Sequence, residues 1–225
     1  QHQIGAQSWP YNYDAIPREF KFQVDGAASE VVFVVKWDVG TLPQDVLLRK
    51  PNGQVIVPTP TEEDSLHRLF RIAAPEAGEW TVVIDFANGL QAAGLPLPNE
   101  LLVEASVSSD LALNAFLGLP VAQRLVGKPM PILATLADAR PLAGAIVNAF
   151  VTAPAGFYNV RLYDDGRHAD GAADDGFYGG TFYATQGHGG YDVVVTASGV
   201  GSDGTPFFRA LEALGVPAHV FHTNE

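Results

Sequence analysis

The segment "DVLLRKPNGQVIV" (45–57) decides the fold class, because it places an apolar run on either side of a turn sequence. Short runs of branched aliphatic residues bounded by turn residues are typical of β-strands. The "PNG" between the runs (51–53) ends in an Asn-Gly pair, which tolerates positive φ and is a strong signal for a tight hairpin turn. The segment therefore predicts a β-hairpin.

Similar runs recur along the whole chain with Gly, Pro, Asn or Asp between them, which is typical of an all-β sandwich. In the first half they include "FKFQV" (20–24), "EVVFVVKW" (30–37), "LFRIA" (69–73), "EWTVVIDF" (79–86) and "ELLVEASV" (100–107). In the second half they include "PMPILATLAD" (129–138), "AIVNAFVTA" (145–153), "YNVRLYD" (158–164), "GFYGGTFYA" (176–184) and "GYDVVVTASG" (190–199). We predict an all-β chain of two tandem immunoglobulin/fibronectin III-like β-sandwich domains.

The predicted domain boundary lies near Ser109, which gives domains 1–108 and 109–225. The strand at 100–107 completes a count of seven strands for the first domain. The segment "SSDLALNAFLG" (108–118) is interpreted as the connection between the two domains. The segment "TEEDSLHRLF" (61–70) is interpreted as a loop with one helical turn, because it is short and two prolines precede it.

Composition and charge narrow the classes of partner. The 225 residues are 47% hydrophobic and 17% charged, which favours folded globular domains over disorder. A formal net charge of −12 disfavours binding to nucleic acid or to anionic membrane surfaces, so cations are the more plausible small partners. The chain has no cysteine, which excludes disulfides, thiolate zinc sites and cysteine nucleophiles.

Enzyme motifs are absent from the sequence. It contains no Gly-x-Ser-x-Gly elbow, no His-Glu-x-x-His zinc motif, no phosphate-binding loop and no dinucleotide fingerprint. No apolar run reaches the roughly 18 to 20 residues that a membrane helix needs. We therefore predict a protein that is not an enzyme and does not insert into membranes.

Three aromatic residues lie close together near the amino terminus, Trp9, Tyr11 and Tyr13 in "SWPYNYD" (8–14). Flat aromatic rings of this kind are what carbohydrate-binding modules offer to sugars, so the three residues are a candidate ligand-binding platform. The alternative interpretation is that they pack over the end of the first domain as an incoming linker.

The stretch "LYDDGRHADGAADDGFYGG" (162–180) concentrates aspartate and glycine. Its candidate metal ligands are Asp164, Asp165, Asp170, Asp174 and Asp175. Calcium prefers six to eight hard oxygen ligands, which carboxylates and carbonyls in a Gly-rich loop can supply, although the spacing does not match an EF-hand loop. Asp and Gly also satisfy turn geometry without any ion. Both interpretations remain open, and calcium is a predicted cofactor because so many like charges repel one another unless they are spread or neutralised.

The same stretch resembles the pattern Leu-x-Asp-Asp-Gly-x-x-x-Asp-x-x-x-x-Asp-Gly-x-Tyr. That pattern belongs to β-sandwich modules that accompany von Willebrand factor type A domains in bacterial secreted or surface proteins and in calcium-activated chloride channel regulators. The matching positions are Leu162, Asp164, Asp165, Gly166, Asp170, Asp175, Gly176 and Tyr178. In the first half "VLLRKPNGQVI" and "PEAGEWTVVI" resemble the preceding module of such proteins, while the type A domain itself is absent, since its Asp-x-Ser-x-Ser motif is missing.

The resemblance implies an extracellular or cell-surface location, immunoglobulin- or fibronectin-like folds, and a spacer, adhesion or assembly role beside a separate functional domain. It transfers no catalytic residue. The first residue is Gln1 and the only methionine is Met130, so we expect a piece of a longer exported polypeptide with its signal elsewhere. The expected partners are other domains of that polypeptide, a surface protein or a glycan. The alternative function is an accessory carbohydrate-binding or substrate-targeting module of a secreted hydrolase.

Overall fold

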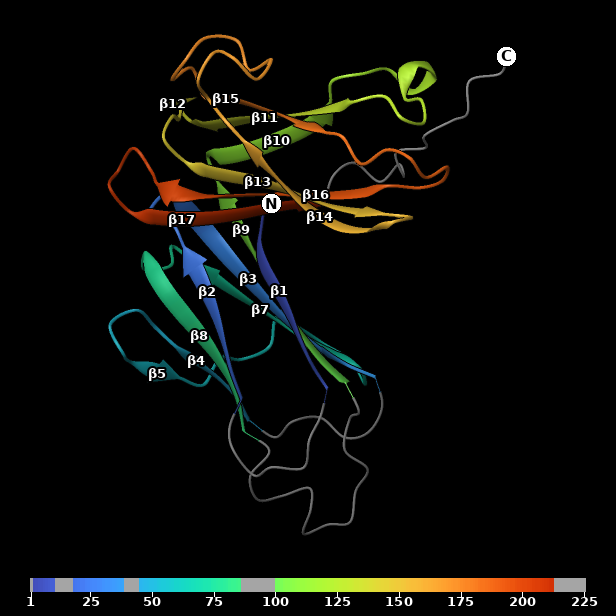
Figure 1. Cartoon of the computed structure of the whole chain (residues 1–225). Helices are drawn as coiled ribbons and strands as arrows, with labels where there is room; N and C mark the ends of the chain where they lie inside the picture. Colours follow the sequence, from blue (N-terminus) through green and yellow to red (C-terminus); the bar gives the residue numbers. More distant parts are fainter. Residues whose placement is uncertain (1, 11–17, 39–44, 86–99, 213–225) are drawn as a thin grey trace. The chain divides into compact units, whose positions relative to one another are not determined.

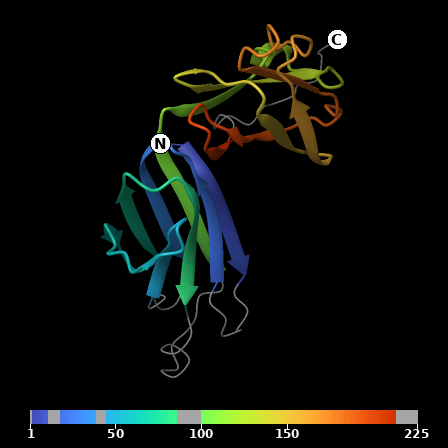
Figure 2. The same cartoon turned by 90° about the vertical axis from the view of Figure 1, so that its left-hand side faces the viewer.

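The computed structural model describes residues 2–10, 18–38, 45–85 and 100–212. The chain divides into two compact units (Figure 1 and Figure 2). The first unit comprises Gln1–Ser109 with Thr205–Phe207, and the second comprises Asp110–Gly204 with Phe208–Glu225.

The first unit contains two antiparallel sheets. One has the strand order β1 (His2–Pro10), β9 (Glu100–Ser109), β3 (Ala28–Trp37), β7 (His67–Ala73) and β6 (Glu62–Glu63). The other has the order β2 (Arg18–Val24), β8 (Gly78–Asp85), β4 (Asp45–Arg49) and β5 (Val55–Ile56). Burial alternates along the strands, as in β2, where every second residue from Phe20 to Val24 is buried. One face of each sheet therefore supplies the core.

Aromatic rings dominate the centre of that core. Phe33 is fully buried and lies with its ring centroid 6.0 Å from that of Phe22 and 5.9 Å from that of Trp80. The indole N–H of Trp80 donates to the carbonyl oxygen of Glu76 at 2.8 Å. Large rings add much apolar area per residue, and this hydrogen bond satisfies the one polar atom that burial of Trp80 would otherwise strand.

The second unit also pairs two sheets. One sheet has the order β14 (Gly156–Leu162), β13 (Ile146–Ala153), β16 (Asp192–Val200) and β17 (Pro206–Glu212). In the other, β11 (Met130–Asp138) lies between β10 (Leu111–Leu117) on one side and β12 (Arg140–Pro141) and β15 (Phe177–Phe182) on the other. Within the described residues the helical structure is a single 3-10 turn, η1 (Val121–Gln123).

A buried arginine is satisfied by the backbone in this unit. Arg209 is 0% exposed, and its guanidinium donates from Nε to the carbonyl of Leu111 at 3.0 Å and from Nη1 to the carbonyl of Phe208 at 2.9 Å. Across the described part of the chain, no buried side-chain nitrogen or oxygen lacks a hydrogen-bond partner. Both units therefore meet the usual requirement that buried polar groups are paired.

The all-β fold class is confirmed, but some segments differ from their predicted form. The segment 108–118 contains β10 instead of a connection, because Leu111, Leu113 and Ala115 alternate into the core and the strand pairs with β11. The start of the chain forms β1, paired with β9, and the segment 61–70 contains β6 and most of β7. Where the structure describes the chain, it contains no helix that is long and apolar enough to cross a membrane.

Candidate functional site

The acidic loop, residues 164–176, connects β14 to β15 in the second unit. Its two ends are held together by a pair of backbone hydrogen bonds, from Tyr163 N–H to the Gly179 carbonyl and from Gly179 N–H to the Tyr163 carbonyl, both 2.8 Å. The loop therefore starts and finishes at adjacent points of the sandwich. Its shape depends on what pairs the backbone groups between those points.

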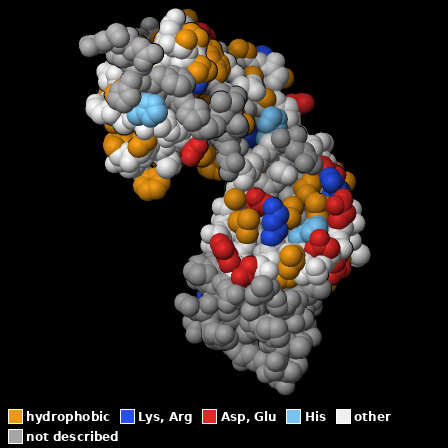
Figure 3. All heavy atoms as spheres, turned by 90° about the vertical axis from the view of Figure 1, so that its right-hand side faces the viewer, with side chains coloured by type: hydrophobic (Ala, Val, Ile, Leu, Met, Phe, Trp, Pro, Cys, Tyr) orange, Lys and Arg blue, Asp and Glu red, His pale blue; other side chains and the backbone are white. Residues whose placement is uncertain are grey.

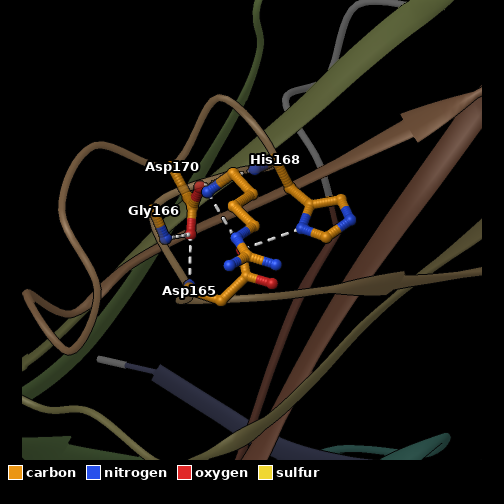
Figure 4. Close-up of polar contacts among 5 residues, drawn as sticks. Asp165, Gly166, His168 and Asp170 are labelled. Carbon is orange, nitrogen blue, oxygen red and sulfur yellow. Dashed lines mark hydrogen bonds and ion pairs between the residues drawn. The ribbon is translucent and has the colours of Figure 1, made fainter.

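Asp170 organises the first half of the loop by hydrogen bonds to its backbone (Figure 4), and its side chain is fully buried. One carboxylate oxygen, Oδ2, accepts the backbone N–H groups of Asp165 and Gly166, the latter at 2.8 Å. The other, Oδ1, accepts the N–H of His168 at 2.8 Å. Burial alone would raise the pKa of Asp170, but these N–H donors outweigh it and hold the pKa below its ordinary value. Asp170 is therefore a structural anion inside its own loop.

Asp164 and Asp175 pair the second half in the same way. The two carboxylate oxygens of Asp164 accept the N–H groups of Asp175 at 3.1 Å and Gly176 at 3.0 Å. The Asp175 carboxylate accepts those of Ala172 and Phe177, both at 2.9 Å. Aspartate side chains that accept nearby backbone N–H groups are the usual means of stabilising tight turns, and here several are combined in one connection.

The other two aspartates, Asp165 and Asp174, are both exposed to solvent. Asp165 accepts the N–H of Arg167 at 3.0 Å, and its Oδ1 lies 2.9 Å from Nδ1 of His168. The His168 ring stacks on Tyr163 with centroids 4.7 Å apart. Asp174 has positive φ (61°), and its carboxylate makes no hydrogen bond to the described residues.

Two glycines are required where the loop meets β15. Gly176 has φ of 76°, in the left-handed region, and a side chain there would meet the Leu136 carbonyl oxygen at 2.8 Å. Gly179 lies under the loop, where an added Cβ would be 2.2 Å from the His168 carbonyl oxygen. Backbone packs on backbone at this point, so a side chain cannot fit without moving the loop.

Tyr178 fixes the neighbouring connection between β12 and β13. Its hydroxyl donates to the carbonyl of Leu142 at 2.9 Å and accepts the N–H of Ala145 at 3.1 Å. Burial is the main cause that raises the pKa of Tyr178 above its ordinary value. The phenol therefore serves as a buried neutral crosslink.

The aspartates, both glycines and the tyrosine of the Asp/Gly pattern thus have structural roles in the second unit. Within the described ranges, no three His, Asp or Glu side chains are grouped as metal ligands. The predicted ligands Asp164, Asp165, Asp170, Asp174 and Asp175 do lie in one loop, and calcium binding by them stays a prediction. Sequence reasoning missed the role of Gly179, and the paired glycines at 179 and 180 were the available signal.

The predicted aromatic platform is only partly within the described structure. Trp9 belongs to β1, where its backbone pairs with Leu101 of β9. Tyr11 and Tyr13 lie outside the described residues. A ligand-binding role for these three residues therefore stays a prediction.

Comparison with known proteins bears on the second half of the chain. Residues 104–215 match the family described as "Conditioned medium factor 2nd Ig-like domain". This part of the chain is an Ig-like β-sandwich module. Ig-like domains are in general non-catalytic, and the Ig-like region carries the whole acidic loop. The association with von Willebrand factor type A domains stays a prediction.

No curated protein matches the chain. Among solved structures it is similar to a DUF4785 family protein from Legionella pneumophila, with a TM-score of 0.58 and 10% identity over 99% of this chain and 65% of that one. It is also similar to the Bacillus licheniformis lipase BlEst2 in its propeptide form, with a TM-score of 0.48 and 14% identity over 93% of this chain and 40% of that one. The chain spans less than two thirds of either structure, and the Legionella likeness supports the fold alone.

Proposed function

We propose that the chain is a non-catalytic structural and interaction module, a spacer or adhesion segment of a larger exported protein. The Ig-like match supports the module class. The family name refers to conditioned medium, the fluid around cultured cells, and that supports an exported location, as does the resemblance of the acidic loop to modules of secreted and surface proteins.

One observation carries the non-catalytic part of the proposal. Four of the five aspartates in the acidic loop accept backbone N–H groups, so their carboxylates already hold the loop backbone in place. A catalytic base needs a pKa near the working pH and free reach to a substrate proton. Asp170 has the opposite properties, because it is fully buried and its pKa is lowered. The residues that most suggest chemistry in the sequence are thus occupied in shaping the backbone.

A substrate panel tests this proposal. The purified 225-residue chain is incubated with ester, glycoside, peptide and phosphate substrates, and we expect no turnover above that of a heat-denatured sample. Turnover that is reduced in an Asp165→Asn or an Asp174→Asn variant would contradict the proposal, because both carboxylates are exposed to solvent.

Calcium is a separable part of the proposal. We propose that the hydrogen bonds from backbone N–H groups to the carboxylates keep the loop folded even when a chelator removes calcium. Calcium then adds stability by binding the remaining carboxylate oxygens. An ion that binds only the folded state raises Tm by mass action. Thermal unfolding is compared in EGTA and in millimolar calcium. Asp174→Asn should remove the increase in Tm, because the Asp174 carboxylate is not committed to the described backbone. An unchanged Tm in the unmodified chain would reject calcium and leave the spacer role standing.

A further inference from the structure

The outer faces of the two large sheets differ in chemistry. In the first unit, ion pairs cross the outer face from strand to strand, namely Lys36 with Glu104 and Arg71 with Glu30. Figure 3 shows basic and acidic side chains side by side on this unit. In the second unit, the outer face of β14, β13 and β16 carries exposed apolar side chains instead. Solvated ion pairs suit a free surface, whereas grouped exposed apolar side chains suggest an interface.

We name the second surface the Phe150 face and define it by Phe150, Phe157, Asn159, Arg161, Asp192 and Val194. Phe150 is 45% exposed and Phe157 is 86% exposed. Neither ring stacks on another aromatic ring or makes a hydrogen bond within the described part of the chain. Exposed, unpartnered aromatic side chains are typical of binding surfaces, where aromatics are enriched.

Strand register fixes the layout of the Phe150 face. Phe150 on the central strand β13 pairs with Asn159 of β14 on one side and with Val194 of β16 on the other. Phe150 is therefore at the centre of the face. Residues two positions away along a strand lie on the same face, so the neighbouring rows can be read from the same register.

The only two charged members of the face lie at opposite corners. Arg161 pairs with Asn148, two residues before Phe150, whereas Asp192 pairs with Thr152, two residues after it. Because Arg161 is on β14 and Asp192 is on β16, the two charges are diagonal across Phe150.

Neither of these charges is neutralised by an ion pair among the described residues. The Asp192 carboxylate makes no contact with a basic group there. The Arg161 guanidinium makes a long hydrogen bond, 3.4 Å, to the Ala145 carbonyl and lies 6.0 Å from the centre of the Tyr163 ring. Both corners therefore keep a charge that a partner can pair.

We propose that the Phe150 face binds a second copy of this chain. A two-fold axis in the plane of the interface, through Phe150 and perpendicular to the line from Arg161 to Asp192, exchanges the two charged corners. It places Arg161 of each copy against Asp192 of the other, and it stacks Phe150 on its own symmetry mate. The surface is thus complementary to itself in charge, as a two-fold interface requires. The strands of the two copies then cross steeply, closer to the orthogonal than to the aligned class of sheet packing.

The interface is small. With strands about 4.8 Å apart and same-face residues about 6.8 Å apart, three strands and three rows cover roughly 300 Å² per copy. Stable dimers commonly bury about 800 Å² per partner, so the pairing is weak and depends on concentration. Such a weak self-contact suits modules that are brought close together on one surface. The proposal goes beyond the spacer role, because self-association is independent of whether the chain is catalytic or exported.

Sedimentation velocity over a range of micromolar concentrations tests the proposal on the full chain. We expect a reversible monomer–dimer equilibrium, which Phe150→Lys abolishes. Val57→Lys is the matched control, because Val57 is 74% exposed in the first unit and the same charge is added outside the face. Circular dichroism and Tm show whether each variant remains folded. A chain that stays monomeric throughout, or a dimer that tolerates Phe150→Lys, would overturn the proposal.

A charge exchange tests the arrangement itself. Asp192→Arg should weaken the dimer by about tenfold, because like charges then face each other twice. Arg161→Asp should do the same, and the double variant should restore the original affinity. If either single variant weakens the dimer and the double variant does not restore it, the two-fold arrangement through Phe150 is wrong. Activity in the substrate panel would not affect this result, so failure of the two proposals is distinguishable.

Discussion

The molecule contains two Asx–Gly connections, a short turn and a long loop, in which Asn or Asp side chains accept hydrogen bonds from backbone N–H groups. The turn at 50–54 needs one side chain, since Asn52 accepts the N–H of Gln54 at 2.8 Å and Gly53 supplies φ of 84°. The acidic loop is much longer, and four carboxylates pair its backbone. Asn52 is exposed to water, whereas Asp170 is fully buried. Asn52 and Asp170 are therefore expected to contribute very differently to the free energy of unfolding, because water can replace the hydrogen bonds of an exposed side chain more easily than those of a buried one.

Replacing the central carboxylate should have the largest effect. Asp170→Ala leaves three N–H groups without an acceptor in a part-buried site, at a cost of about 1 to 3 kcal/mol each where no water can reach them. We expect a total loss of about 3 to 5 kcal/mol in the free energy of unfolding, measured by urea denaturation. A loss similar to that of an exposed residue would show that water replaces the carboxylate.

Acid titration gives an independent check on the same residue. The pKa of Asp170 is lower in the folded chain than in the unfolded chain. Its stabilisation is therefore complete above the unfolded value of about 3.9 and is lost as the pH falls through the folded value. Asp170→Asn should flatten the decline in stability at acid pH. An identical pH profile in both proteins would contradict the charge-based explanation.

Gly179→Ala should follow in size. The added Cβ would lie 2.2 Å from the His168 carbonyl oxygen. The loop or β15 must then shift, at a cost of about 2 kcal/mol. Gly204→Ala is the matched control, because its Cβ meets nothing within 4 Å and only its φ of 81° opposes the change. Thermal unfolding of the two variants separates steric clash from backbone strain, and an unchanged stability in Gly179→Ala would mean that the close contact under the loop costs nothing.

Tyr178→Phe should have a smaller effect, because it removes the hydroxyl and keeps the buried ring. The N–H of Ala145 and the carbonyl of Leu142 each lose a partner, so we expect a loss of about 1 to 2 kcal/mol. Urea denaturation measures it, with Tyr183→Phe as the control, since Tyr183 is 67% exposed. No difference between the two variants would show that the crosslink is dispensable.

The smallest effect is expected in the short turn. Asn52→Ala removes the bond to Gln54 and a 3.2 Å contact with Glu76. Water is available to both partners, so we expect a loss of about 0.5 kcal/mol. The measurement is the same urea titration. A loss as large as that from Asp170→Ala would remove the distinction between the two connections.

Local patterns predicted much of the fold and of the loop. The Asn-Gly pair placed the turn at 51–53, and alternating apolar residues placed β2, β3 and β13 to within a few residues. The Asp/Gly pattern marked the loop, because turn chemistry depends on residues close in sequence. The same locality explains the misses. β10 was not predicted, because Ser108, Ser109 and Asp110 suggested a connection between domains. Its pairing with β11 depends on residues that are distant in sequence.

The layout of the Phe150 face could not be predicted from sequence either. Phe150, Arg161 and Asp192 lie on three different strands, and only the pairing of β13 with both neighbours brings them onto one surface. A strand shifted by one residue would turn Phe150 into the core. The set of side chains on one face of the sheet therefore depends on the register of strand pairing, which a single sequence leaves undetermined.

The short strand β6 has a consequence for behaviour in crowded solution. It borders its sheet with only two residues, Glu62 and Glu63, both exposed, and Arg68 on the neighbouring strand binds Glu63 at 2.8 Å. A second molecule that tried to add a strand there would find little backbone to pair with and would bring carboxylate against carboxylate. This border therefore resists amyloid-like growth, so many copies can be held at high local density without joining at that side.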